Sequence, residues 1–177
     1  MKVVVFLFRR LILAHMKVAI VGGGAAGFFA AFSVKEHHPS AHVSLLEKSN
    51  KLLTKVKISG GGRCNVTHAC FQVSKLSKSY PRGAQQLKKI FSQFQPNDTI
   101  AWFASRGVEL KRESDGRMFP ITDDSQTIID CFLREAKKKK ITIIKQAQVS
   151  KILSKDDGFS VVVNDVSSTY DKVIIAT

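Results

Sequence analysis

Several features that would identify other classes of protein are missing from this chain of 177 residues. It contains no run of about 20 uncharged apolar residues, which excludes a polytopic membrane protein. Its three cysteines include no C-x-x-C pair, and no Cys/His group has zinc-site spacing, so neither a disulfide framework nor a metal site is expected. Acidic residues are also few, with 14 Asp and Glu against 28 Lys and Arg.

What remains is an ordinary globular composition, with 44% apolar and 24% charged residues. The length by itself predicts one domain, and the unpaired cysteines predict a reducing, cytoplasmic location. The net charge is +14, of which +10 falls within residues 1–80. Such an excess favours anionic partners, namely nucleic acid, anionic lipid or a phosphorylated ligand, and a merely solvated surface is the alternative. The lysine run Lys137–Lys140 follows a predicted helix, so a structural role at the negative end of the helix dipole is favoured over an RNA patch.

The first fifteen residues differ from the rest of the chain in their pattern of apolar and charged residues. Two apolar stretches, Val3–Phe8 and Leu11–Ala14, are split by Arg9-Arg10, which argues against a signal peptide. A second Met-Lys-Val begins at Met16 and leads directly into the first strong motif. We therefore interpret residues 1–15 as an N-terminal extension or a mis-called start, with a peripheral membrane anchor as the alternative, and residues 16–177 as the folded part.

Hydrophobic periodicity predicts an α/β order in which a three-stranded antiparallel meander precedes one closing strand. A long, Gly-, Ser- and Lys-rich functional loop with short helical pieces is expected over residues 50–81. The aromatic residues of the central helices are expected in the core. The predicted strands are Lys17–Val21, Val43–Leu46, a buried strand Ile141–Ile144, the meander Val149–Leu153, Phe159–Val163 and Ser167–Tyr170, and the closing Lys172–Ala176; the predicted helices are Ala25–Glu36, Gln85–Phe94, Asp98–Arg106 and Asp123–Ala136, and the aromatic set is Phe91, Phe94, Trp102 and Phe103.

The first informative motif is G-x-G-x-x-G, formed by Gly22, Gly24 and Gly27 between a predicted strand and a predicted helix. In a dinucleotide site the first glycine permits a tight turn and the second lets a pyrophosphate approach the backbone. The third lets the helix pack on the strand. The helix N-terminus then offers free N–H groups to the phosphates. The alternative is a structural glycine-rich turn without a ligand.

Glu47 follows the second predicted strand, twenty residues after Gly27. A carboxylate at this place accepts hydrogen bonds from the hydroxyls of an adenosine ribose and repels a 2′-phosphate, which disfavours NADP. The motif does not separate NAD from FAD, because both contain adenosine diphosphate.

A second glycine loop, Ser59-Gly60-Gly61-Gly62-Arg63-Cys64-Asn65, offers crowded backbone N–H groups and a fixed positive charge. With this segment the sequence resembles the BaiN/YhiN-type NAD(P)/FAD-dependent oxidoreductases, also described as aminoacetone-oxidase-like flavoproteins. The segments that carry the resemblance are Val18–Gly27, Leu45–Lys48, Lys57–Thr67 and Gly116–Pro120.

The resemblance implies FAD bound in a glutathione-reductase-like FAD/NAD(P)-binding Rossmann fold, with NAD(P)H as a candidate electron donor. It also implies that Lys172–Thr177 is a strand that normally continues into glycine, so that the fold is C-terminally incomplete and the substrate domain is absent. The implied cofactor-binding residues are Gly22, Gly24, Ala25, Ala26 and Gly27 at the pyrophosphate, Glu47 and Lys48 at the ribose, Gly61, Gly62, Arg63, Cys64 and Asn65 toward the flavin, Val149 at the adenine, and Thr177 at the strand end.

Three further residues or segments stay open. Cys64 and Cys70 lack the C-x-x-x-x-C spacing of disulfide reductases, so a buried or flavin-lining thiol is favoured over a redox pair. Arg117-Met118-Phe119-Pro120 is either close to the flavin or a packed loop between helices, and the packed loop is favoured. His68 is a proton-donor candidate, although a lone loop histidine is more often solvated.

The predicted function is a FAD-dependent oxidoreductase acting on an unknown small molecule, with no catalytic residue assigned. The alternatives are a Rossmann module that senses NAD without catalysis, and a flavin-dependent tRNA-modifying protein suggested by the net charge of +14.

Overall fold

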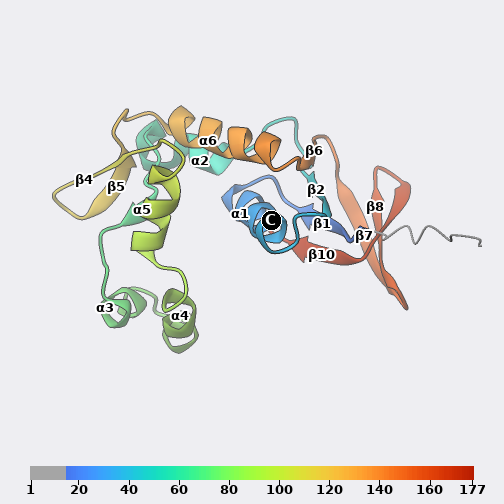
Figure 1. Ribbon diagram of the computed structural model, residues 1–177, viewed down its shortest axis with the longest axis horizontal. Coiled ribbons are helices and arrows are strands. Elements are labelled where there is room, and N and C mark those ends of the chain that lie inside the picture. Colours follow the sequence, from blue (N-terminus) through green and yellow to red (C-terminus); the bar gives the residue numbers. More distant parts are fainter. Residues whose placement is uncertain (1–14) are drawn as a thin grey trace, which may run out of the picture.

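The computed structural model describes residues 15–177, and its centre is a four-stranded parallel sheet (Figure 1). The strand order is β10-β1-β2-β6, so the first strand lies between the second and the last. The four strands of this sheet follow one another in the predicted order, and interpretations of residues 1–14 fall outside the described residues. The strands are β1 (Lys17–Val21), β2 (His42–Leu46), β6 (Thr142–Ile144) and β10 (Lys172–Ile175).

Helices cover one face of this sheet. Alternate residues of the central strands, such as Val18 and Ile20 on β1, are buried in the core beneath α1 (Ala25–His37) and α6 (Ser125–Lys138). Stacked and edge-to-face rings join these helices, including Phe28 and Phe132 with centroids 5.8 Å apart. Burial of such aromatic side chains dominates the energetics of a core of this size.

The predicted antiparallel meander covers the opposite face. Its strands are β7 (Val149–Lys155), β8 (Gly158–Val163) and β9 (Val166–Tyr170), as the Asp-Gly and Asn-Asp turn signals indicated. Val161 of β8 packs in a small core with Ala19 and Leu46 of the parallel sheet. The sheet is therefore closed on both faces, as parallel sheets require.

The segment Arg117–Pro120 is not a packed loop between helices, so that prediction was wrong. It forms β5, the middle strand of a small antiparallel sheet of order β3-β5-β4, with β3 (Thr67–His68) and β4 (Leu110–Arg112). Asp115-Gly116 makes the turn into β5, with Gly116 at φ +88°. The same Asp-Gly signal that indicated the meander could have predicted this hairpin.

Residues 50–81 contain short helical pieces, as predicted. The last of them, α3, forms a projecting pair with the next helix, α4. In Figure 1, α3 and α4 lie together beyond the lower end of α5, away from the parallel sheet. The helices of this region are α2 (Thr54–Ile58), the 3₁₀ turn Ser59–Gly62, α3 (Val73–Lys78), α4 (Ala84–Phe91) and α5 (Pro96–Ala104).

Two burial predictions need correction. Phe103 and Trp102 pack in the main core as expected, but Phe91 lies outside that core against the ring of Tyr80, and Phe94 is 43% exposed beside the ring of Phe29. Strand β6 is not fully buried, and Ile144 is 40% exposed, because β6 is an edge of the described sheet. The described residues include no helix long and apolar enough to cross a membrane.

Candidate functional site

The first glycine turn joins the carboxyl end of β1 to the start of α1. Gly24 is the N-cap of α1, and no side chain caps the helix. The residues of its first turn, Ala25 and Ala26, are exposed. The first N–H groups of a helix have no partner within the helix, so this end presents donors and the positive end of a dipole to a ligand.

Two of the three motif glycines are required by close contacts. Gly22 has φ +119°, and a Cβ there would lie 2.5 Å from the carbonyl oxygen of Ala176. A Cβ at Gly27 would lie only 1.9 Å from the carbonyl oxygen of Gly22. At Gly24, by contrast, a Cβ would meet no atom within 4 Å. The turn is therefore held tightly on both sides of an open position where a ligand can approach the backbone.

Glu47 links the end of β2 to this turn. Its Oε2 accepts a hydrogen bond from the backbone N–H of Gly23 at 2.8 Å, and its Oε1 accepts one from Ser49 at 2.9 Å. Burial alone would raise the pKa of Glu47, but the hydrogen bonds from Ser49 and Gly23 and the charge of Lys48 leave it below its usual value. Each carboxylate oxygen retains capacity for a further hydrogen bond, so an ionised acceptor stands beside the glycine turn.

The C-terminal strand and the start of the meander also reach this edge of the sheet. The N–H of Ala176 donates to Val21 at 2.8 Å, which places the backbone of Thr177 against Gly22. The N–H of Ala147 donates to the carbonyl of Glu47 at 2.8 Å, two residues before Val149. The carboxyl ends of β1, β2 and β10 thus bring the first group of predicted residues together, at the place where ligands bind open α/β sheets.

The second glycine loop is a 3₁₀ turn in which Gly60, Gly61 and Gly62 all have positive φ. Gly60 is pressed against the core, because a Cβ there would lie 2.7 Å from the Phe119 ring. Gly61 and Gly62 would place a Cβ in open space. The backbone of these two glycines is therefore accessible to a ligand.

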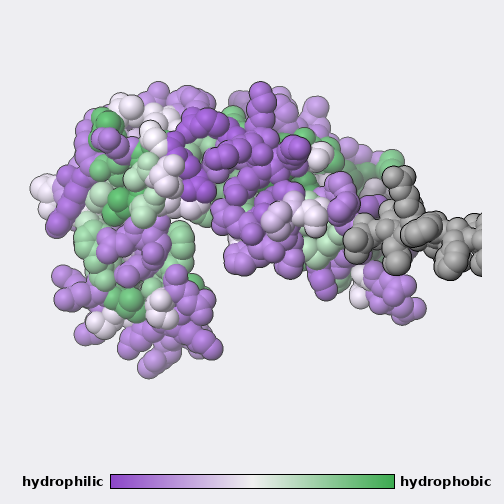
Figure 2. All heavy atoms as spheres, in the orientation of Figure 1, coloured by the Kyte–Doolittle hydropathy of each residue, from purple (hydrophilic) through white to green (hydrophobic). Residues whose placement is uncertain are grey.

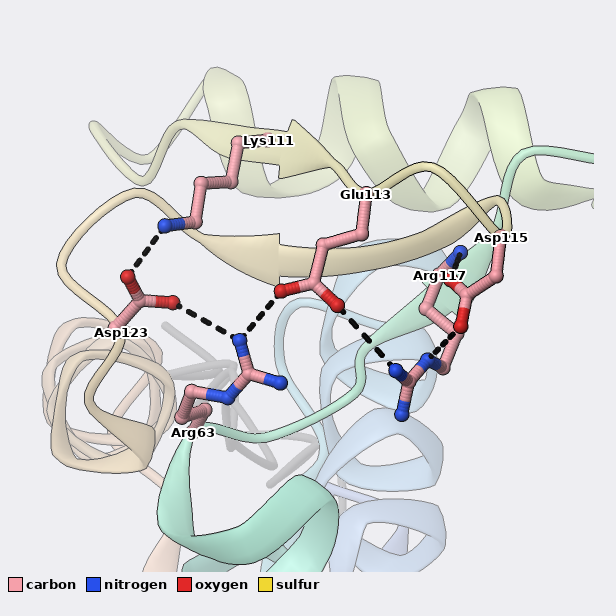
Figure 3. A network of polar contacts seen from close by, with 6 residues as sticks. All are labelled: Arg63, Lys111, Glu113, Asp115, Arg117 and Asp123. Atoms are coloured by element: carbon pink, nitrogen blue, oxygen red, sulfur yellow. Dashed lines mark hydrogen bonds and ion pairs between the residues drawn. The ribbon is translucent and has the colours of Figure 1, made fainter.

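Arg63 does not extend freely from this loop, and its ion pairs are drawn in Figure 3. Its guanidinium lies 2.5 Å from Glu113 and 3.5 Å from Asp123, and it covers the Phe119 ring at 4.0 Å. Asp123 also pairs with Lys111. Sequence reasoning did not single out Glu113 or Asp123, because nothing local indicates that they meet Arg63 from 50 and 60 residues away.

The remaining loop residues have different environments. Cys64 is 5% exposed and has φ +63°, and burial raises the pKa of its thiol. It is free, as are Cys70 and Cys131, so no disulfide joins Cys64 to Cys70. Asn65 is exposed beside the loop. His68 is exposed on β3, where its Nε2 lies 3.0 Å from the carbonyl oxygen of Asp115.

Together the parallel sheet, the glycine turn at its carboxyl edge, the carboxylate after β2 and the meander define a dinucleotide-binding domain of the Rossmann type. Comparison with known proteins gives the family. Residues 16–177 match the HI0933-like protein Rossmann domain, so the chain belongs to that family. This confirms the resemblance found in the sequence.

Curated relatives include a 3-dehydro-bile acid delta(4,6)-reductase from Clostridium scindens, 28% identical over 160 residues, and a ribosomal RNA dihydrouridine synthase from Escherichia coli, 27% identical over 158 residues. The matches cover 90% and 89% of this chain and 38% of each relative. The chain thus spans well under half the length of these relatives.

Solved structures show the same fold at low identity. The E. coli quinol fumarate reductase matches with a TM-score of 0.66 at 15% identity, covering 92% of this chain and 32% of that one. A 3-ketosteroid-delta4-(5alpha)-dehydrogenase from Rhodococcus jostii has a TM-score of 0.66 at 13% identity, with 92% and 46% covered.

Proposed function

We propose that this chain binds FAD and is the FAD-holding part of an oxidoreductase. The observation that carries the proposal is the attachment of the Glu47 carboxylate to the glycine turn at Gly23, next to the uncapped start of α1. This arrangement offers N–H donors to a pyrophosphate and a charged acceptor to a ribose. Membership of the HI0933-like family supports FAD as the dinucleotide.

The residues around the first turn fit the adenosine diphosphate half. Space at Gly24 and the free donors of Ala25, Ala26 and Gly27 suit the pyrophosphate, and Gly22 keeps the turn tight. Glu47 would accept the ribose hydroxyls, with Lys48 exposed beside it. The backbone of Val149 would contact the adenine, and that of Thr177 would approach the phosphates.

The second loop fits the flavin half. The open backbone of Gly61 and Gly62 and the amide of Asn65 would contact the ribityl chain or the ring. Cys64 would line the site as a protonated thiol, since its pKa is raised by burial. Arg63 would act mainly through position, because Glu113 and Asp123 already engage its guanidinium.

When bound, FAD supplies hydride or electron transfer. The chain's own residues bind it, fix its orientation and hold the carboxylate of Glu47 ionised. A small-molecule substrate and NAD(P)H as electron donor belong to this proposal, and no catalytic base is assigned.

A fluorescence titration with FAD tests the proposal. Flavin emission should change on binding, and FAD should bind more tightly than NADH. Tighter binding of NADH would instead support an NAD-sensing module. No uptake of FAD by correctly folded protein would contradict the proposal.

A second candidate function is the reduction of a base in RNA. Two specific observations favour it: the net charge of +14, and relatives described as ribosomal RNA dihydrouridine synthases in E. coli and Haemophilus influenzae. Reduction of a nucleobase is a reaction that a flavin can perform. Uridine reduction in an RNA incubated with FAD-loaded protein and NAD(P)H, measured by mass spectrometry, would distinguish it from small-molecule chemistry.

A further inference from the structure

The positive charge of the protein is concentrated in one part of the chain. Residues 48–97 contain ten basic residues and no acidic residue. Two of these cations pair with carboxylates from elsewhere, Lys57 with Asp124 and Arg63 with Glu113. The other eight have no ion-pair partner within residues 15–177. Their field is therefore not neutralised locally, and an anionic partner would be attracted to it.

Five of the eight unpaired cations lie on the projecting α3–α4 pair. Lys75 and Lys78 are three residues apart on α3, and residues at this spacing share one helix face. Lys88 and Lys89 lie on the last turn of α4. We define the α3–α4 surface as these exposed cations with two exposed aromatic residues: Phe71, Lys75, Lys78, Tyr80, Arg82, Lys88 and Lys89.

The aromatic residues of this surface are only half buried. Phe71 is 43% exposed and Tyr80 is 42% exposed. Tyr80 is held by a contact with the ring of Phe91, with centroids 5.5 Å apart. Figure 2 shows the corresponding lobe as hydrophilic spheres around smaller apolar areas. Rings set among cations are the combination that binds single-stranded nucleic acid, because bases stack on the rings while the cations contact phosphates.

We propose that the α3–α4 surface binds single-stranded RNA. The proposal rests on the second candidate function for its substrate class, and it adds the surface that would hold the RNA. Along the chain, β3 connects the second glycine loop to α3.

An anionic membrane is a poorer match to the same surface. Interfacial helices present a broad apolar face to the lipid. Here α3 has six residues and α4 has eight, and α4 exposes one large apolar residue, Ile90, among glutamines and lysines. Helices of six and eight residues offer only about two turns of apolar face, so they bury little area against lipid, whereas separate rings suit separate bases.

Fluorescence anisotropy with a labelled oligouridine probe over a range of NaCl concentrations tests the proposal on the full chain without FAD. Affinity should fall steeply with salt, with a log–log slope of about 0.7 for each phosphate contact on a single strand. Replacing Lys75, Lys78, Lys88 and Lys89 with Gln should reduce that slope by about 2 to 3.

The matched control removes the same charge elsewhere. The four lysines of the control are exposed, at the end of α6 and directly after β6, and have no ion pair in the described part of the chain: Lys137, Lys138, Lys140 and Lys145. Changing these four to Gln should leave the slope within about one contact of the unmodified protein. An equal loss in both quadruple variants would overturn the proposal, because it would show attraction by net charge alone.

Stacking is tested separately. Tyr80→Ala and Phe71→Ala should each weaken oligouridine binding by about 5- to 100-fold with little change in salt slope. Val166→Ala, at a residue 67% exposed on the meander, is the control. No salt-sensitive RNA binding, or binding to phosphatidylserine vesicles in its place, would overturn the proposal. Circular dichroism of each variant checks that it is folded. FAD titration does not depend on RNA binding, so a failure of the FAD-binding proposal can be told apart from a failure of the RNA-binding proposal.

Discussion

The carboxylate of Glu47 accepts a hydrogen bond at 2.8 Å from the backbone N–H of Gly23, the middle residue of the first glycine triplet. This bond fixes the turn after β1 to the end of β2. The other carboxylate oxygen of Glu47 accepts a hydrogen bond from the backbone N–H of Ser49 at 2.9 Å. A residue expected only to contact a ribose therefore also shapes the turn. Its removal should affect both stability and binding, and the following predictions separate the two.

Glu47→Gln should lower both stability and FAD affinity. An amide has one acceptor oxygen, so one of the two backbone N–H groups loses its partner, at a cost of about 1–3 kcal/mol in the free energy of unfolding. FAD affinity should fall about tenfold, because a charged acceptor is lost. Urea denaturation and FAD titration measure the two effects, and unchanged values for both would contradict the role assigned to Glu47.

The stability effect of Glu47 should depend on pH. Its folded-state pKa lies below the ordinary value of 4.5, so ionisation stabilises the fold above that pH. The stabilisation is lost as pH falls from 4.5 through the lower folded-state pKa. The difference in unfolding free energy between the natural protein and Glu47→Gln should shrink over this range, which urea denaturation at several pH values measures. A difference that grows on acidification would have the wrong sign.

Gly24→Asp should abolish FAD binding without unfolding the protein. Gly24 has φ −88° and open space around its Cα, and Asp is a favoured N-cap residue, so stability should be unchanged or raised by only a few tenths of a kcal/mol. The added carboxylate would occupy and repel the pyrophosphate position. Gly24→Ala, which adds no charge, is the matched control. Retained FAD affinity in the Asp variant would place the ligand elsewhere.

Gly27→Ala should be far more destabilising than Gly61→Ala. The new methyl at Gly27 would lie 1.9 Å from the carbonyl oxygen of Gly22, so α1 or the turn must move. At Gly61 the methyl meets open space, and only the positive φ of +69° is unfavourable, at about 1 kcal/mol. Thermal melts in the absence of FAD test which of the two variants is less stable. A lower melting temperature for Gly61→Ala than for Gly27→Ala would contradict the prediction.

A double-mutant cycle on Arg63 and Glu113 should give a small, favourable coupling energy. The two side chains are 34% and 27% exposed, so solvent screens the pair even though it is close. Arg63→Gln, Glu113→Gln and the double variant, compared by urea denaturation, provide the measurement. If Arg63 instead contacts a phosphate of FAD and does not pair with Glu113, Arg63→Gln will weaken FAD binding, and the coupling energy between Arg63 and Glu113 will be near zero.

Cys70 should react with a thiol reagent faster than Cys64 or Cys131. The latter two are buried, and burial raises the pKa of both thiols, which lowers their thiolate fraction. Mass spectrometry after timed alkylation of the folded protein would give the order. Rapid modification of Cys64 would indicate a reactive thiol at the second glycine loop.

Much of the fold was accessible from local patterns. Alternation over residues 17–21 and the glycine triplet predicted the first strand, the turn and the helix, because side-chain periodicity and positive φ are local constraints. The hairpin of β4 and β5 was missed although its Asp115-Gly116 turn is visible in the sequence. The exposure of Ile144 was not predictable from an apolar run, since sheet order decides which strand is at the edge.

By itself the sequence determined the positions of both glycine loops, the acidic residue after β2 and the family of the domain. These features depend on backbone sterics and on spacing within a few dozen residues, so they can be recognised without knowing how distant segments pack. Only the tertiary structure decided that Glu47 holds the glycine turn, that Arg63 pairs with Glu113 and Asp123, and that the α3–α4 cations have no ion-pair partner among residues 15–177. Those outcomes depend on which distant segments pack together, because an ion pair forms or fails according to the fold that surrounds it.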